Sequence, residues 1–251
     1  MLWRVEYRKH LPYFAMVIAV TAGLGIASAI APDVEVFSVL LTMSTLVTWT
    51  ATIVYTSACT LRFLTLGDDL LLHVSSLSPW RLVTVKALVL GSYMAMQCAA
   101  TVMAQSPHIS EVVGPESGRV FTYLVAAKLV SIACFLISVV FAAAVAKTIR
   151  QRGPATALFV VALMILVAAQ AIVLWHLGAP ETQFFFIGVG GDFTTVNLYA
   201  NVLPLVLTGP GEGFLPPVAG LSMLLNAAVA VAIALVTAGL VRWRRFDHTE
   251  L

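Results

Sequence analysis

The sequence predicts an all-α polytopic membrane protein with six transmembrane helices. Of its 251 residues, 60% are hydrophobic and only 10% are charged. Several stretches reach the roughly 20 apolar residues that cross a hydrocarbon core about 30 Å thick. A soluble fold does not need so many stretches of this kind, so we expect a single transmembrane domain over residues 1–251.

The first span is preceded by a short amphipathic segment at residues 1–12. Trp3 and Tyr7 share one helical face and two arginines share another, which is typical of a helix lying in the membrane interface. Pro12 then permits a sharp bend into a first span at 13–31. A signal peptide is the alternative, because a basic start, an apolar stretch and an Ala-Ile-Ala motif also fit that pattern.

The remaining spans follow from the apolar stretches between polar turns. A polar loop with Pro107, His108 and Glu111 separates the third span from the fourth, and a basic turn separates the fourth from the fifth. The last connection, 178–217, is rich in glycine and proline but too apolar for a free loop. We expect it to re-enter the membrane from the outer side as helices covered by protein. The five further spans are expected at 37–61, 83–104, 120–146, 155–177 and 218–241.

The basic residues fix the predicted orientation. Basic residues in short loops stay on the cytoplasmic side, and in the six-span order twelve of the 14 lysines and arginines fall on one side. We therefore expect a multi-pass protein of the inner or plasma membrane with both termini cytoplasmic. The twelve residues are Arg4, Arg8, Lys9, Arg62, Arg81, Lys86, Lys147, Arg150, Arg152, Arg242, Arg244 and Arg245.

The cytoplasmic loop between the second and third spans carries a helical pattern of its own. Asp68 can cap a helix that Pro79 ends, which gives about ten residues at 68–78. Such a helix is too short to be stable alone in water, so its apolar face must rest on the membrane surface, on this chain or on a partner. The apolar residues at helical spacing are Leu70, Leu71, Val74 and Leu77.

No motif of catalysis or cofactor binding occurs in the chain. HExxH, CxxC and GxxxxGK[ST] are all missing from the sequence, and no basic patch suggests nucleic acid. Cys59, Cys98 and Cys134 each fall within a span, where we interpret them as packing residues. Residues 220–223 (GLSM) lack the closing glycine of an intramembrane serine protease. We expect no enzyme, no cofactor and no metal site in this chain.

Three polar residues within the spans are candidates for a transport pathway, namely Lys128, Gln170 and Asn226. An ionisable residue inside a span often marks a pathway. The alternative is that Lys128 extends its long side chain outward to Glu111 or Glu116 at the membrane boundary. Gln170 and Asn226 would then serve as hydrogen-bond partners between helices.

The order of elements resembles the ABC-2 family of membrane permeases over the whole chain. The resemblance rests on the amphipathic start (LWRVEYRKHLPYF), the cytoplasmic loop (GDDLLLHVSSLSPWRLVTVKAL), the basic turn, the re-entrant outer segment and the basic tail. In that family a coupling helix in the first cytoplasmic loop docks on an ATPase subunit. The resemblance assigns this contact to Asp68, Asp69, Leu70, Leu71, His73, Val74, Ser76, Leu77 and Ser78.

The resemblance implies the permease subunit of a bacterial ATP-driven exporter. A second permease subunit, of the same or a related chain, would complete the pathway in the lipid membrane, and a separate ATPase subunit would bind ATP and Mg²⁺. Few fixed charges line the spans, which favours an amphipathic cargo such as a lipid-like molecule or an antimicrobial peptide. The alternatives are an ATP-independent secondary carrier or channel component, and a membrane enzyme or assembly scaffold.

Overall fold

The computed structural model describes residues 2–31, 35–65, 79–113, 117–149, 151–176, 186–187, 193–194 and 217–243. Within this part of the chain, five helices contain stretches long and apolar enough to cross a membrane. The protein is therefore helical and of the multi-pass membrane class. The long helices are α1 (Leu2–Ile30), α2 (Glu35–Thr65), α4 (Pro79–Val113), α5 (Ser117–Ala146), α6 (Arg152–His176) and α7 (Pro217–Trp243).

The predicted sixth span corresponds to α7. This helix has 27 residues, but the apolar stretch among its described residues, Ala227–Leu240, is shorter than the other five. Five of the six predicted spans are therefore supported, and these belong to α1, α2, α4, α5 and α6. The sixth span, at α7, stays a prediction.

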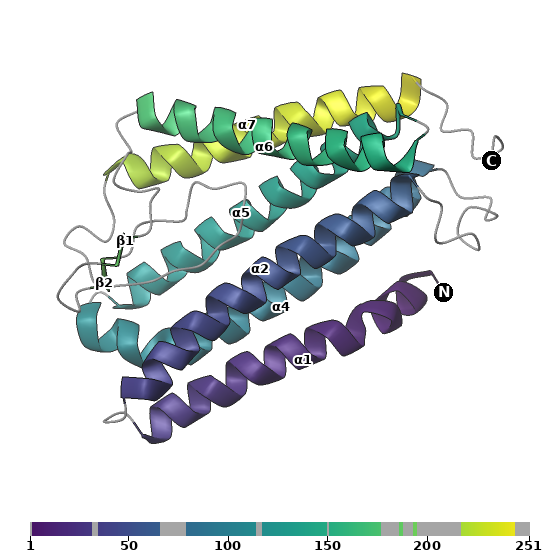
Figure 1. Cartoon of the computed structure of the whole chain (residues 1–251). Helices are drawn as coiled ribbons and strands as arrows, with labels where there is room; N and C mark the ends of the chain where they lie inside the picture. The colour runs from purple at the N-terminus through teal and green to yellow at the C-terminus, as the bar shows by residue number, and fades with distance from the viewer. Residues whose placement is uncertain are drawn as a thin grey trace.

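The helices form a layered bundle in which α5 occupies the middle. α1 packs against α2 and α4, α4 packs against α5, and α5 packs against α6 and α7. The start of α1 and the end of α7 lie at the same end of the bundle (Figure 1). We call this the N-terminal end; α2 ends there and α4 begins there.

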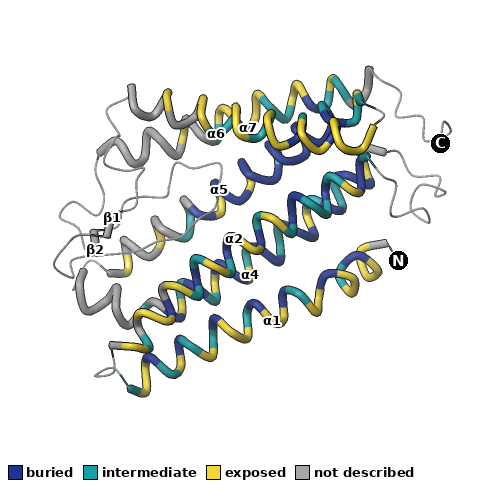
Figure 2. Tube along the Cα trace, in the orientation of Figure 1, coloured by how far each residue is buried: buried dark blue, intermediate teal, exposed yellow. Residues whose placement is uncertain are grey.

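Burial follows these layers (Figure 2). Phe135, Val139 and Ala142 of α5 have no exposed surface, whereas Met164 and Ile165 of α6 are each more than 60% exposed. Exposed apolar side chains suit a helix that faces lipid, because hydrocarbon chains solvate them. Many polar residues instead turn inward, towards the interfaces of α1, α2, α4 and α5.

Pro12 does not separate two helices, because α1 is one continuous helix with Pro12 inside it. The separate interfacial helix at 1–12 is therefore corrected to the first turns of α1. The reason is a single buried stripe that passes through both parts and packs on α2 and α4, while Pro12 lies on the exposed side. The buried stripe consists of Glu6, His10, Phe14, Val17, Thr21, Gly25 and Ser28.

The polar loop expected between the third and fourth spans is also wrong in extent. α4 continues through Pro107 and His108 to Val113, and α5 begins at Ser117. Proline has no N–H to donate, so the carbonyl four residues earlier loses its helical partner. The Ser106 hydroxyl donates to that carbonyl, on Met103, at 2.8 Å. This local hydrogen bond explains how the helix tolerates Pro107.

Most of the predicted outer segment lies outside the described residues. The exceptions before α7 are two strands, β1 (Phe186–Ile187) and β2 (Phe193–Thr194), which pair antiparallel with Phe186 opposite Thr194. These four residues are extended and belong to none of the expected re-entrant helices. β-branched and aromatic side chains favour an extended backbone there, and the re-entrant arrangement of the rest of 178–217 stays a prediction.

Candidate functional site

The residues predicted to contact an ATPase subunit, at 68–78, lie outside the described residues. Gln170 and Asn226 belong to α6 and α7, but their side chains are outside the described part of the structure. Lys128 is therefore the one predicted site residue whose side chain can be placed.

Lys128 points into the bundle. Its side chain is 5% exposed, and its Nζ lies 4.4 Å from the centroid of the Trp49 ring of α2. The Lys128 side chain is thus covered by the bundle and is not exposed at the membrane boundary, whereas the predicted contact with Glu111 or Glu116 involves side chains outside the described residues. A cation over an aromatic face is attracted by the negative potential of the ring, which explains how α2 can hold an ammonium group inside the bundle.

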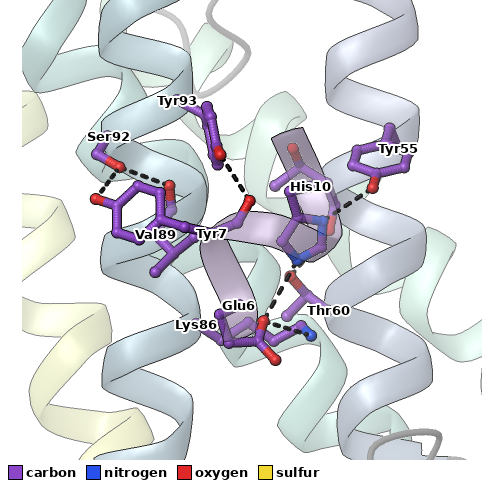
Figure 3. A network of polar contacts seen from close by, with 10 residues as sticks. Glu6, Tyr7, His10, Tyr55, Thr60, Lys86, Val89, Ser92 and Tyr93 are labelled. Atoms are coloured by element: carbon purple, nitrogen blue, oxygen red, sulfur yellow. Dashed lines mark hydrogen bonds and ion pairs between the residues drawn. The ribbon is translucent and has the colours of Figure 1, made fainter. Parts of the chain in front are cut away.

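A second group of ionisable side chains lies at the N-terminal end of the bundle, where α1, α2 and α4 meet (Figure 3). Glu6 and His10 of α1 are 2% and 0% exposed, and Lys86 of α4 is 4% exposed. The Glu6 Oε2 lies 3.4 Å from both the His10 Nε2 and the Lys86 Nζ. The Lys86 Nζ also lies 4.8 Å from the centroid of the Phe63 ring of α2. We call Glu6, His10 and Lys86 the acid–base cluster.

The tyrosines around this cluster connect it to α2. The His10 Nδ1 lies 2.9 Å from the Tyr55 hydroxyl. The Tyr55 ring stacks on Tyr13, with centroids 4.0 Å apart and planes 10° apart. His10 therefore has a carboxylate at one ring nitrogen and a hydroxyl at the other, and both partners are held by packing.

Tyr7 and Tyr93 fix α1 to α4 on the other side of the cluster. The Tyr93 hydroxyl donates to the Tyr7 carbonyl at 2.7 Å. The Tyr7 hydroxyl lies 2.7 Å from the Ser92 hydroxyl, which itself donates to the Val89 carbonyl, so Tyr7 is the donor to Ser92. These bonds position the α1 backbone next to Glu6 and His10 (Figure 3).

Hydroxyl and amide groups continue from the tyrosines towards Lys128. Thr52 donates to the Gln97 Oε1 at 2.8 Å, so the Tyr13 hydroxyl, 3.2 Å from Thr52, is the donor to it. Thr101 donates to the Gln97 carbonyl. The Trp49 Nε1 donates in turn to Thr101 at 3.3 Å. Polar contacts thus extend along α1, α2 and α4 from the N-terminal end to the level of Lys128.

Several polar atoms in this region have no hydrogen-bond partner among the described residues. The Gln97 Nε2, the hydroxyls of Thr45, Thr56 and Ser57, and the His10 Nε2, whose contact with Glu6 is not a hydrogen bond, are all buried in this way. An unpaired buried polar group costs about 1–3 kcal/mol, and water commonly satisfies such groups where the surroundings are polar. These atoms make the interface of α1, α2 and α4 a polar part of the bundle interior.

The sequence contains a signal for the acid–base cluster that a search for apolar spans does not detect. Glu6 and His10 are four residues apart and lie on the same helical stripe as Phe14 and Val17, so one face could have been traced across Pro12. Lys86 carries no such signal, because its pairing with Glu6 depends on how α4 packs against α1. Among the described residues no group of three His, Cys, Asp or Glu side chains could hold a metal ion.

Among the described residues outside the spans, Lys147 is the one group with a clearly shifted pKa. It follows the last residue of α5, and burial lowers the pKa of its ammonium group to about 8. The neutral form is favoured there because removing a charged group from water is costly.

A comparison of the chain with protein-family models, with curated proteins and with solved structures finds no match. The resemblance to ABC-2 permeases therefore depends on the order of the sequence elements alone.

Proposed function

We propose that this chain is the permease subunit of an ATP-driven exporter of the ABC-2 type. The supporting observation is that α2 ends and α4 begins at the N-terminal end of the bundle. α2 ends there at Thr65 and α4 begins there at Pro79, close to the cluster in which Glu6 of α1 pairs with Lys86 of α4. A force applied to the connecting residues, 66–78, would reach three helices at once.

In this proposal residues 68–78 form the coupling helix and face the cytoplasm, and α7 is the sixth span. The ATP and Mg²⁺ bind to a separate ATPase subunit, because the sequence has no phosphate-binding loop. A second permease subunit completes the pathway, and both termini are cytoplasmic in the bacterial inner membrane. Lys128, Gln170 and Asn226 are the candidate pathway residues, and the cargo is amphipathic.

The test is a charge placed on the apolar face of the coupling helix. Val74→Glu would bury an unpaired carboxylate in the groove of the ATPase, at a cost of several kcal/mol. We expect the variant to insert and fold but to lose the ATPase subunit during purification. Ser76→Glu is the matched control, because it places the same charge at the rim of the groove, where water hydrates it. Full retention of the ATPase by Val74→Glu would contradict the coupling assignment and favour a helix resting on the inner leaflet.

An ATP-independent carrier is the second candidate function. The observation that favours it is the burial of four ionisable side chains between the helices, namely Glu6, His10, Lys86 and Lys128. Buried ionisable groups are typical of carriers coupled to ions or protons. If the wild-type chain purifies from its native membrane without any ATPase subunit, the carrier becomes the better proposal.

A further inference from the structure

We propose that the edge where α1 meets α2 binds an anionic phospholipid of the surrounding membrane, with the headgroup phosphate between Lys9 and Arg62. The site depends on the contacts of α1 with α2 and on the membrane class of the fold. It stands whether or not residues 68–78 bind an ATPase subunit. We call this region the α1–α2 edge. Its residues, all exposed or half-buried, are Lys9, Tyr13, Met16 and Val20 of α1 with Thr48, Tyr55, Cys59 and Arg62 of α2.

Two stacked tyrosines show where the helices meet at this edge. The Tyr13 and Tyr55 ring centroids are 4.0 Å apart and the ring planes differ by 10°. Tyr55 extends from α2 towards α1 (Figure 3). The Tyr13 hydroxyl bonds Thr52 and the Tyr55 hydroxyl bonds His10, yet both tyrosines are only half-buried. The two rings are therefore fixed in position at a surface that lipid reaches.

Basic side chains of both helices lie beside this stack, on the side of the N-terminal end. Lys9 is one turn of α1 before Tyr13, and Arg62 is two turns of α2 beyond Tyr55; both are exposed. Both also act electrostatically on the thiol of Cys59, which hydrogen-bonds Tyr55. Lysine has three N–H donors and arginine has five, so each can bind a phosphate alongside contacts within the chain. Two cations from different helices thus favour an anionic ligand at one place.

The α1–α2 edge becomes apolar further along α1. Met16 and Val20 follow Tyr13 at helical spacing on the same face, and they are 59% and 44% exposed. Thr48 of α2 is half-buried, and its hydroxyl donates to a carbonyl of its own helix. From Lys9 to Val20 the edge therefore changes from cationic to aromatic to aliphatic over about 16 Å, at 1.5 Å per residue.

Two tryptophans mark the level of the lipid headgroups at this end. Trp3 of α1 and Trp80 of α4 are 44% and 41% exposed, and tryptophan is enriched where headgroups meet hydrocarbon. Lys9 follows Trp3 by about 9 Å along the helix axis. A long basic side chain at this depth can extend back to the headgroups, and the Cα–Cβ bond of Lys9 already tilts towards the start of α1.

A phospholipid presents its parts in the same order as the α1–α2 edge, with phosphate, then glycerol esters, then acyl chains. A headgroup with a net negative charge gains from both cations, whereas a zwitterionic headgroup carries a cation of its own that opposes them. An acidic protein surface is the other partner that would suit Lys9 and Arg62. It does not account for Met16 and Val20, which are exposed at a depth that hydrocarbon chains occupy.

The experiment is photo-crosslinking of the full chain in nanodiscs of phosphatidylcholine. A trace of phosphatidylglycerol with a diazirine in its acyl chain is the probe, and mass spectrometry locates the labelled peptides. We expect labelling to concentrate at 13–20 of α1 and 48–55 of α2, and to be at least about fivefold weaker with the same probe built on phosphatidylcholine. Equal labelling by the two probes would overturn the proposal, because the edge would then be an ordinary lipid-facing surface.

Single substitutions separate this site from the general charge of the N-terminal end. Lys9→Gln and Arg62→Gln should each reduce the labelling by phosphatidylglycerol about fivefold, the effect of one basic residue near an anionic lipid. Both positions are exposed, so the variants should fold. Arg8→Gln is the matched control, because it removes an exposed cation at the same depth from the face of α1 opposite the buried stripe. It should change the labelling less than about twofold. Equal losses in all three variants would overturn the site.

A photoreactive amino acid in place of Met16 tests the other class of partner. In native membranes we expect it to capture phospholipid, released by lipid extraction and identified by its mass. Capture of a protein at this position, a second copy of the chain included, would overturn the proposal in favour of a protein interface.

Discussion

The two ends of the α1–α4 contact are held by different physical means. At the N-terminal end Glu6 and Lys86 pair inside the bundle, 3.4 Å apart. Towards the other end α1 presents Gly25, where an added Cβ would lie 2.5 Å from the Cβ of Ala104. The first contact depends on charge and the second on volume. In a membrane, where burial of apolar surface does not drive helices together, both are recognised ways to fix a helix pair.

Removing charge at the N-terminal end should weaken the α1–α4 contact most strongly. Glu6→Gln leaves Lys86 and His10 without their carboxylate, and removing one partner of a buried ion pair costs about 3–5 kcal/mol. We expect a loss of this size in the free energy of unfolding, measured by denaturant titration in bicelles. The double variant Glu6→Gln, Lys86→Met should recover more than half of the loss. Equal losses in the single and double variants would show that the unpaired Lys86 ammonium is not the cause of the loss.

The α1–α4 pair also shows where reasoning from the sequence succeeded and where it did not. The helical membrane class and five spans follow from the length of apolar stretches, because backbone groups in lipid must be satisfied within a helix. Local rules failed at both prolines. Pro12 is helical because one buried stripe packs on both sides of it. Pro107 is helical where the Ser106 hydroxyl donates to the carbonyl that the missing N–H leaves without its partner.

The candidate site was harder to predict than the fold. Lys128 stood out because it is charged within a span, but its direction depends on Trp49 of a different helix. The pairing of Glu6 with Lys86 joins residues 80 positions apart. Spacing along one helix carries no information about such a contact, so only the packing of α1 on α4 could reveal it.

Added volume should weaken the other end of the contact. Gly25→Leu should push α1 away from Ala104, and overpacking of this kind typically costs about 1–3 kcal/mol. Gly23→Leu is the matched control, because nothing lies within 4 Å of an added Cβ at Gly23. We expect the control to be neutral or slightly stabilising, since leucine favours the helix more than glycine does. Comparable losses in both variants, by thermal unfolding in detergent, would show that the close contact is unimportant.

A smaller effect is expected at Pro107, beyond the Gly25 contact. Ser106→Ala leaves the Met103 carbonyl without the hydroxyl that bonds it at 2.8 Å, and one lost hydrogen bond costs about 1 kcal/mol. In a Pro107→Ala background the alanine N–H can donate to that carbonyl instead. The same Ser106→Ala change should then cost much less. Additive effects of the two substitutions in a double-mutant cycle would contradict the compensation.

The smallest effect is again one of charge, at Lys147 after the end of α5. Burial lowers the pKa of Lys147 to about 8, below the roughly 10.4 of an unfolded lysine. Between these values the unfolded chain binds more protons than the folded one, so the contribution of Lys147 to stability rises with pH across this window. Because the group is partly exposed, water reduces the effect to below about 1 kcal/mol.

Lys147→Met should therefore be more stable than the wild type at pH 7, and the difference in unfolding temperature should shrink as the pH rises towards the unfolded pKa. A difference that stays constant with pH would assign the effect of the substitution to packing and not to the charge.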